Sequence, residues 1–400
     1  MTNCNSTASR RFTTWFYAYS FLKEFVPIYP VYLVLFGARG LSVLQISLLL
    51  IIWQVPVIAL EVPSGVWADR WSRKQMLVIG AAAKLLCMVA WTLAHGFAFF
   101  ALGFVFWGVQ SAFCSGTTEA LLYDNLEQFG RRDDYERVAG IGHFYRRIAV
   151  TISMLLGGVI AAVNMDLVLV LSIITTTTTL LVTLMIEECQ HSAVPDRTSY
   201  LDTLRAGAKS CLGSWPIARI MVYTALVLGS AGVLDEYDQL YAQWVGLPLG
   251  LIGAWGAVRY GLEALGSRFA YRLSSLFDRP IGRYSISLAA GCCLLASVIY
   301  RSFWLLPLYA AFYMITSAGS VLTEAALQRE IDTAERATIT SFSSLVYELF
   351  CIGLYYVFGL AAEMGGLRIG IGVFGVMVIV YSVGALLVAR GRLAVVTDGA

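Results

Sequence analysis

Residues 65–74 read Gly65-Val-Trp-Ala-Asp69-Arg70-Trp-Ser72-Arg73-Lys74 and place four charged side chains between two long apolar segments. Over the 400 residues, 58% are hydrophobic and only 14% are charged, whereas soluble chains carry about 25% charged residues. This composition excludes a soluble globular protein. The charged stretch is therefore expected to be a short loop between two membrane spans.

The apolar segments on either side of this loop predict a helical membrane protein. A helix needs about 20 mostly apolar residues to cross a bilayer, and the apolar runs here are continuous, which favours helices over a barrel. We predict an all-α polytopic membrane protein with twelve transmembrane helices in two pseudo-symmetric six-helix bundles. The predicted spans are residues 13–38, 43–68, 75–95, 97–124, 138–163, 166–187, 217–242, 248–275, 284–302, 304–328, 337–364 and 368–389.

The second half of the sequence repeats the first. The matched positions are Glu119 with Glu324, Glu61 with Glu263, and Ile46 with Ile252, at offsets of 205, 202 and 206 residues. A duplicated membrane unit is how many secondary transporters are built, with the solute path between the halves. The repeat predicts an N-terminal six-helix bundle at 1–188, a cytoplasmic linker at 189–216 and a C-terminal six-helix bundle at 217–400.

Charge in the loops predicts the orientation of the chain. Arginines and lysines gather in the loops of one side, among them Arg73 and Lys74, whereas the opposite loops hold little beyond Arg39, Arg301 and Arg368. By the positive-inside rule both termini are cytoplasmic, as an even number of spans requires. We expect a multi-pass protein of the cell inner (plasma) membrane.

The charged loop also carries a family resemblance. The pattern Gly-x-x-x-Asp-Arg-x-(Gly/Ser)-Arg-(Arg/Lys) between the second and third spans resembles motif A of the major facilitator superfamily, although Ser72 stands where many members have glycine. The resemblance covers the whole chain and implies the twelve-helix fold of that family. It also implies a latch that closes the cytoplasmic side in the outward-open state. The latch residues would be Gly65, Asp69, Arg70, Arg73 and, at the end of the fourth span, Asp124.

The fifth span is similar, more weakly, to the antiporter-associated motif C of the same family. Small residues stand at nearly every position of the motif, but its proline is missing; the matching residues are Gly140, Ala149, Ser153, Gly157 and Gly158. Small residues are common wherever membrane helices pack. The similarity therefore favours export over uptake only slightly.

Ionisable residues inside spans are costly and are expected to be functional. Glu61 and Glu263 occupy matching positions in the cytoplasmic third of their spans, which favours a role in the conformational gate that both halves share. Arg259 precedes Glu263 by one helical turn and could neutralise it.

Other charged residues are expected to bind substrate or protons. In the family, the first, fourth, seventh and tenth spans line the cavity, and a contact between Arg146 and Glu119 would be a natural protonation switch. The candidates for substrate binding or proton coupling are Glu24, Glu119, Arg146, Asp235 and Glu324. We predict no catalytic residues and no metal site.

These features predict a secondary active transporter that works by alternating access. Proton-coupled export of a small organic compound (a drug, metabolite or siderophore-like molecule) is the leading interpretation, and a proton-driven uptake permease for a small polar nutrient is the alternative. A polytopic membrane enzyme is a remote alternative. It would need catalytic residues that come together, but the three histidines, His95, His143 and His191, are well separated in the sequence. The chain has no phosphate-binding loop for ATP. We expect a monomer with a small-molecule substrate, protons and the lipid bilayer as partners, without nucleic acid or cofactor.

Overall fold

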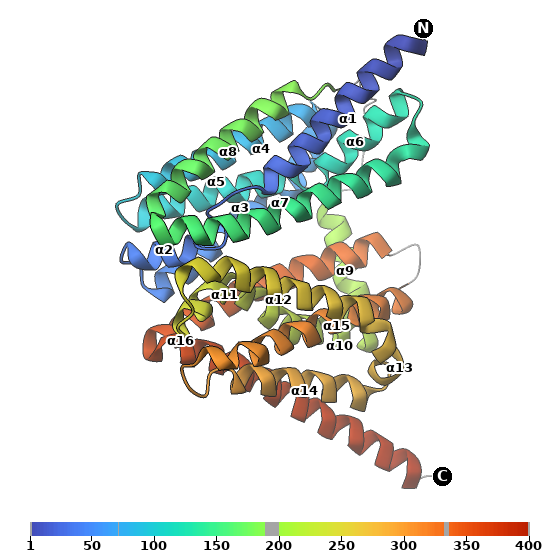
Figure 1. The fold of residues 1–400 in the computed structure, drawn as a ribbon. Coiled ribbons are helices and arrows are strands. Elements are labelled where there is room, and N and C mark those ends of the chain that lie inside the picture. Colours follow the sequence, from blue (N-terminus) through green and yellow to red (C-terminus); the bar gives the residue numbers. More distant parts are fainter. Residues whose placement is uncertain (1, 71, 189–199, 332–335, 399–400) are drawn as a thin grey trace. The chain divides into compact units, whose positions relative to one another are not determined.

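The computed structural model describes residues 2–70, 72–188, 200–331 and 336–398, and within these ranges it contains helices and no strands (Figure 1). The contacts of Gly65, Asp69 and Arg70 lie outside the described residues. Eight of the described helical segments are long and apolar enough to cross a membrane by length and composition alone. Four predicted spans remain. Residues 13–38 form a helix pair interrupted at prolines, residues 248–275 a helix that carries charged residues, residues 284–302 a shorter helix, and residues 368–389 the second half of a kinked helix. The predicted twelve-helix fold class is confirmed.

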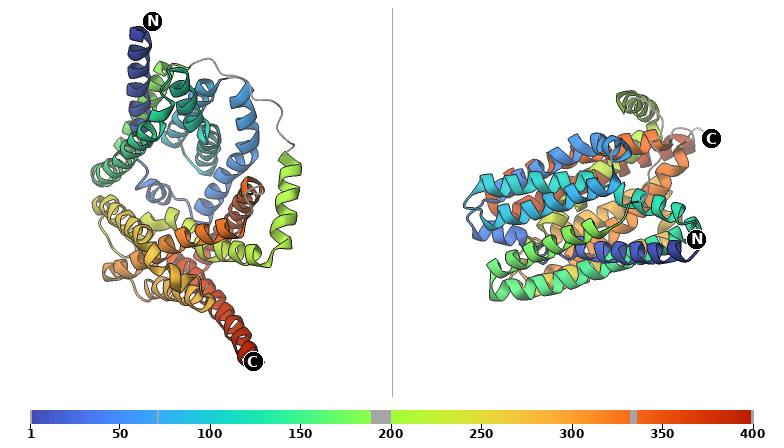
Figure 2. Two further views of the ribbon diagram at one scale, coloured as in Figure 1. Left: turned by 90° about the vertical axis from the view of Figure 1, so that its right-hand side faces the viewer. Right: turned by 90° about the horizontal axis from the view of Figure 1, so that it is seen from above.

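The chain divides into two compact units. The first contains Met1–Leu41, Leu49–Arg197 and Leu249–Ala254, and the second contains Ser42–Leu48, Thr198–Pro248 and Trp255–Ala400. Within each unit the long helices run nearly side by side (Figure 2). Residues 189–199 of the predicted linker lie outside the described residues, and the rest of it contains the short helix α9 (Tyr200–Gly213).

Eight helices build most of the first unit. They are α1 (Thr2–Glu24), α2 (Tyr32–Ala38), α3 (Val43–Arg70), α4 (Arg73–Thr92), α5 (Phe97–Cys114), α6 (Thr117–Gln128), α7 (Tyr135–Val163) and α8 (Met165–Met185). Helix α4 packs against α5 and α8, and α1 packs against α7 and α8.

Two of the predicted spans in this unit are interrupted. Between α1 and α2 lie Pro27 and Pro30, which cannot donate a backbone hydrogen bond, and the N–H of Ile28 donates instead to Ser172 Oγ at 3.1 Å. Between α5 and α6 the chain turns at Gly116, whose φ of +67° suits glycine. Because lipid demands internally satisfied backbones, such breaks are expected only where protein or a cavity surrounds them.

Helix α7 makes close backbone contacts through its small residues. A Cβ added at Gly157 would lie 2.0 Å from the carbonyl oxygen of Pro27, and one added at Gly158 would lie 3.0 Å from the backbone nitrogen of Gly253. Only glycine permits such approaches. The motif C-like positions of α7 therefore pack helices together.

The second unit repeats this arrangement with different interruptions. Its helices are α10 (Trp215–Tyr223), the π-helical turn Thr224–Leu228, α11 (Gly229–Trp244), α12 (Leu249–Phe269), the 3₁₀ turn Ala270–Leu273, α13 (Ser274–Phe277), α14 (Pro280–Ala296), the 3₁₀ turn Phe303–Leu305, α15 (Leu306–Glu330) and α16 (Arg336–Asp398). Helix α16 consists of two helices that meet at a kink at Gly365 and Gly366, where φ is −155° and +75°. Its last turns extend past the neighbouring helices of the unit (Figure 1).

Candidate functional site

A cavity of about 470 Å³ in the first unit brings together three of the five predicted binding residues, Glu24, Glu119 and Arg146. The break between α5 and α6 forms part of its wall through Ser115 and Gly116. Because α6 begins at Thr117, Glu119 lies in the first turn of a helix, where a negative charge is favoured. The interruption in this span therefore positions a carboxylate at the cavity.

Arg146 and Glu119, whose contact the sequence left open, form an ion pair. Arg146 Nη2 lies 3.4 Å from Glu119 Oε1 and 3.4 Å from His143 Nε2. The side chain of Glu119 is 42% exposed and that of Arg146 is 20% exposed. Both partners of the pair are therefore accessible from the cavity.

A buried lysine beside this cavity was missed by the sequence analysis. Lys84 of α4 is 6% exposed, and its Nζ lies 3.1 Å from the ring centroid of Trp107 and 4.9 Å from that of Tyr29. The two rings stack with centroids 5.4 Å apart and line the cavity. A lysine inside a predicted span was a visible signal, because such a charge is rarely placed there without a function.

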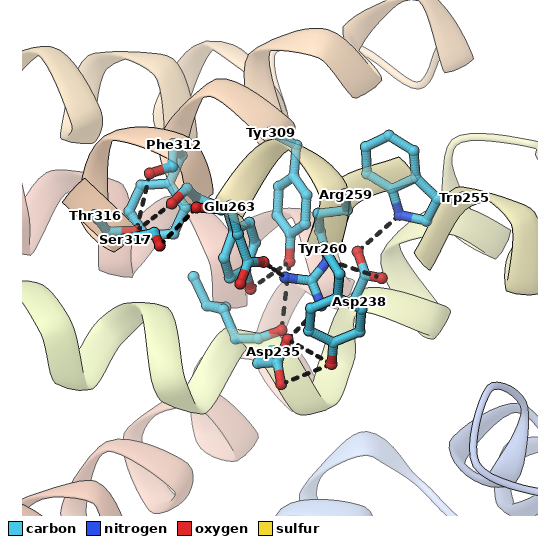
Figure 3. A network of polar contacts seen from close by, with 12 residues as sticks. Asp235, Asp238, Trp255, Arg259, Tyr260, Glu263, Tyr309, Phe312, Thr316 and Ser317 are labelled. Carbon is cyan, nitrogen blue, oxygen red and sulfur yellow. Dashed lines mark hydrogen bonds and ion pairs between the residues drawn. The ribbon is translucent and has the colours of Figure 1, made fainter. Parts of the chain in front are cut away.

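The second unit holds a buried charge network centred on Arg259 of α12 (Figure 3). The guanidinium, 1% exposed, pairs with Asp235 and Asp238 of α11 and with Glu263 of its own helix. The Arg259 Nε to Asp238 Oδ2 distance is 3.2 Å. The pairing of Arg259 with Glu263 was predicted, whereas the two aspartates were not expected to join it.

Aromatic groups enclose the Arg259 network. The guanidinium carbon lies 4.3 Å from the ring centroid of Tyr260 and 4.2 Å from that of Tyr313, a geometry that stabilises a cation. Trp255 Nε1 donates to Asp238 Oδ1 at 2.8 Å, and the Tyr260 hydroxyl donates to Asp235 at 3.2 Å. Among the described residues, three carboxylates thus surround one cation.

The network joins two residues to which the sequence analysis gave different roles. Asp235 was expected to bind substrate or protons, and Glu263 was expected to act in the conformational gate. Both carboxylates pair with the guanidinium of Arg259, so a change in the charge of one alters the surroundings of the other.

The remaining predicted residues are dispersed. Glu324 on α15 and Glu61 on α3 are exposed, and neither shares an ion pair with a residue in the described part of the chain. The two members of the pair Glu119 and Glu324 therefore occupy different surroundings although the sequence repeat matches them.

Part of the motif A charge set is visible. Arg73, at the start of α4, pairs with Asp124 of α6 as predicted, and its Nη1 donates to the carbonyl oxygen of Ala120 at 2.6 Å. The Arg73 side chain is 10% exposed. Gly65, Asp69 and Arg70 lie outside the residues whose contacts are described.

The chain matches the family model of the Major Facilitator Superfamily over residues 12–353. Among solved structures it is similar to a point mutant of the nucleoside transporter NupG, with 14% identity and a TM-score of 0.76 over 95% of this chain and 99% of that one. It is also similar to a bacterial homologue of the human lysosomal transporter Spinster in an inward-facing and unoccupied conformation, with 16% identity and a TM-score of 0.71 over 98% of each chain.

A point mutant of the peptide transporter POT gives 13% identity and a TM-score of 0.65 over 96% of this chain and 94% of that one. At these identities the likeness establishes the fold alone. No curated protein matches the sequence.

Proposed function

Since the chain belongs to the major facilitator superfamily and is a membrane transporter rather than an enzyme, we propose that it exports a small organic compound by alternating access, in exchange for protons. The observation that carries the proton coupling is the placement of three carboxylates, Asp235, Asp238 and Glu263, on one buried guanidinium.

Charge counting explains why this network would bind protons. With all three carboxyl groups ionised, the cluster has two negative charges more than Arg259 can neutralise. Uncompensated charge is expensive inside a membrane protein. Protonation removes the excess without moving any chain segment, and entry of water would favour release of the proton. The cluster thus has the properties needed to load and release protons as access alternates.

The cavity of the first unit is proposed to bind the solute. Its volume of about 470 Å³ lies within the roughly 300–1,000 Å³ typical of small-molecule sites. The stacked rings of Tyr29 and Trp107 offer an apolar wall for a planar group, and Glu24, Glu119 and Arg146 offer donors and acceptors of both charges. These groups support a small polar compound with a planar ring.

Direction and orientation rest on the sequence. The motif C-like small residues of α7 favour export, and the basic loops favour cytoplasmic termini. The Arg73 to Asp124 pair would latch the cytoplasmic side as the family resemblance implies. Uptake of a small polar nutrient is the alternative, favoured by the nucleoside and peptide transporters among the structural neighbours.

The proposal can be tested in proteoliposomes. Compounds that raise the melting temperature of the purified protein, from a panel that includes ethidium, uridine and dialanine, would be added to vesicles loaded with a pH-sensitive dye. We expect solute-dependent proton movement and accumulation against a gradient when a pH difference is imposed, with no effect of ATP. Transport that ignores the pH difference, or that requires sodium, would exclude proton coupling. Exchange for protons would accumulate the solute on the acidic side of the membrane. Accumulation on the alkaline side would instead establish proton-driven uptake.

A further inference from the structure

The second unit has an apolar groove that neither the charge network nor the solute cavity uses. The groove has a volume of about 1080 Å³ and lies between α10, the start of α14 and the second helix of α16. Its walls include the side chains of Trp215, Val222, Val380 and Val388, which are 61%, 48%, 64% and 59% exposed. Such apolar surface on the outside of a membrane helix unit is a site for lipid chains.

Two arginines line this otherwise apolar groove. Arg219 lies on α10 and Arg279 immediately precedes α14. Among the described residues, neither side chain has an ion pair or a hydrogen bond, and the Nε atom of Arg219 is buried without an acceptor. A buried guanidinium donor without an acceptor is costly, so an anionic group from outside the chain would be stabilised here.

The start of α14 in the second unit can be compared with the start of α4 in the first unit. Arg279 follows Arg73 by 206 residues, which equals the offset between Ile46 and Ile252 in the sequence repeat. In the first unit, Glu188 accepts hydrogen bonds from the backbone N–H of Arg73, at 2.6 Å, and from the hydroxyl of Ser72. The start of α4 is thus held by a carboxylate that follows the end of α8.

The residue before Glu188 forms an ion pair in the first unit. Arg11 of α1 pairs with Glu187 at 3.3 Å, and Arg219 follows Arg11 by 208 residues. The cations of the first unit therefore have counterparts in the second, near the repeat offset.

The carboxylates have no such counterparts. The second helix of α16 corresponds to α8, and at an offset of 206 residues Leu393 and Ala394 stand where the first unit has Glu187 and Glu188. After Tyr381, the acidic residue of α16 is Asp398, at its last position. In the first unit Glu187 pairs with Arg11 and Glu188 caps the start of α4, whereas the Arg73 guanidinium pairs with Asp124. The second unit thus has two arginines at its groove without the carboxylates that follow α8 in the first unit.

We propose that an anionic phospholipid occupies this groove, with its phosphate between Arg219 and Arg279 and an acyl chain along the apolar wall. Arginine binds phosphate through paired, charge-assisted hydrogen bonds. Lipid joins an anionic head to an apolar chain, which matches a groove with two cations and otherwise apolar walls. The lipid phosphate supplies negative charge where the first unit has Glu187 and Glu188 after α8, and the lipid links α10, α14 and α16. This inference does not depend on the direction or coupling of transport.

Delipidated protein provides the first test. Phosphatidylglycerol is expected to raise its melting temperature by several degrees, whereas phosphatidylcholine and inorganic phosphate have little effect. The double variant Arg219→Gln with Arg279→Gln should lose the response. Arg268→Gln, an exposed arginine of the same unit outside the groove, is the matched control and should keep it. A response retained by the double variant, or one equal for both lipids, would refute the site. An equal response to inorganic phosphate would refute a lipid as its occupant.

A gain-of-charge variant provides a second test that does not rely on weakening the fold. Val388→Glu adds a carboxylate to the groove from the second helix of α16. We expect the variant to be more stable than wild type without lipid and to lose the response to phosphatidylglycerol. Val388→Gln has a similar shape without the charge and should behave like wild type. If Val388→Glu responds to phosphatidylglycerol as wild type does, the proposed exchange of carboxylate for lipid is wrong.

Discussion

Arg146 in the first unit and Arg259 in the second are both arginines of membrane helices, but their surroundings differ. Arg146 is 20% exposed, borders a cavity and pairs with one carboxylate at 3.4 Å. Arg259 is 1% exposed, pairs with three carboxylates and lies between two tyrosine rings. Exposed pairs contribute little stability and exchange partners easily, whereas removing one partner of a buried pair is strongly destabilising. We therefore expect the first unit to recognise solute and the second to hold charge.

The largest expected effect comes from Arg259→Met. This variant leaves three carboxyl groups without their cation, and breaking a buried pair costs about 3–5 kcal/mol. The matched variant Arg146→Met removes a part-exposed pair, which contributes about 0.2–1 kcal/mol. Melting temperatures of the two purified variants check the comparison. Equal losses would show that the two arginines do not differ in their contribution to stability.

The next effect concerns Lys84 and the aromatic wall of the first unit. A desolvated cation–π contact contributes about 2 kcal/mol, and removing it with Lys84→Met frees Trp107 and Tyr29 to shift. We expect solute affinity to fall by about tenfold or more, measured as KM in proteoliposomes. Lys84→Arg keeps the cation and should retain most of the affinity. If both variants transport with wild-type KM, Lys84 has only a structural role.

A smaller effect on stability separates Glu263 from Glu24. Glu263→Gln removes one of the two excess negative charges and leaves Arg259 paired with two aspartates, so we expect stability to change by no more than roughly 1 kcal/mol, less than a broken buried pair, together with an altered pH dependence of flux. Glu24→Gln should fold normally and lose transport, because Glu24 borders the solute cavity. Melting temperature and pH-driven flux measured side by side check both. Normal transport by Glu24→Gln would contradict its assignment to the solute site.

The smallest effect is expected at Glu324. This residue is exposed and lies outside both the cavity and the Arg259 network in the described structure, so Glu324→Gln should change stability by no more than about 0.5 kcal/mol. Its repeat mate is the more sensitive position, and Glu119→Gln should lower flux through the loss of the Arg146 pair. A flux lower in Glu324→Gln than in Glu119→Gln would reverse the proposed division between the units.

Several site contacts could be predicted because they are local or belong to a known motif. Arg259 and Glu263 are one helical turn apart, so their pairing follows from helix geometry. The pair of Arg73 and Asp124 followed from the resemblance to motif A. The contact of Arg146 with Glu119 was anticipated only as a possibility. The two residues lie on different helices, and the sequence does not specify which faces of those helices meet.

Composition and hydrophobic run length determined that this chain is a helical membrane protein, because the bilayer imposes the same length and polarity on every span. The matched positions of its two halves determined that it is built from a repeat. The tertiary structure decided which charges meet. Asp235 and Asp238 join Arg259, and Lys84 lies against Trp107, because side chains from different helices approach only once rotation and depth are set by packing. The sequence pattern specifies the rotation and the depth of a helix only to within about one helical turn. A shift of one turn is enough to separate the two partners of a buried ion pair.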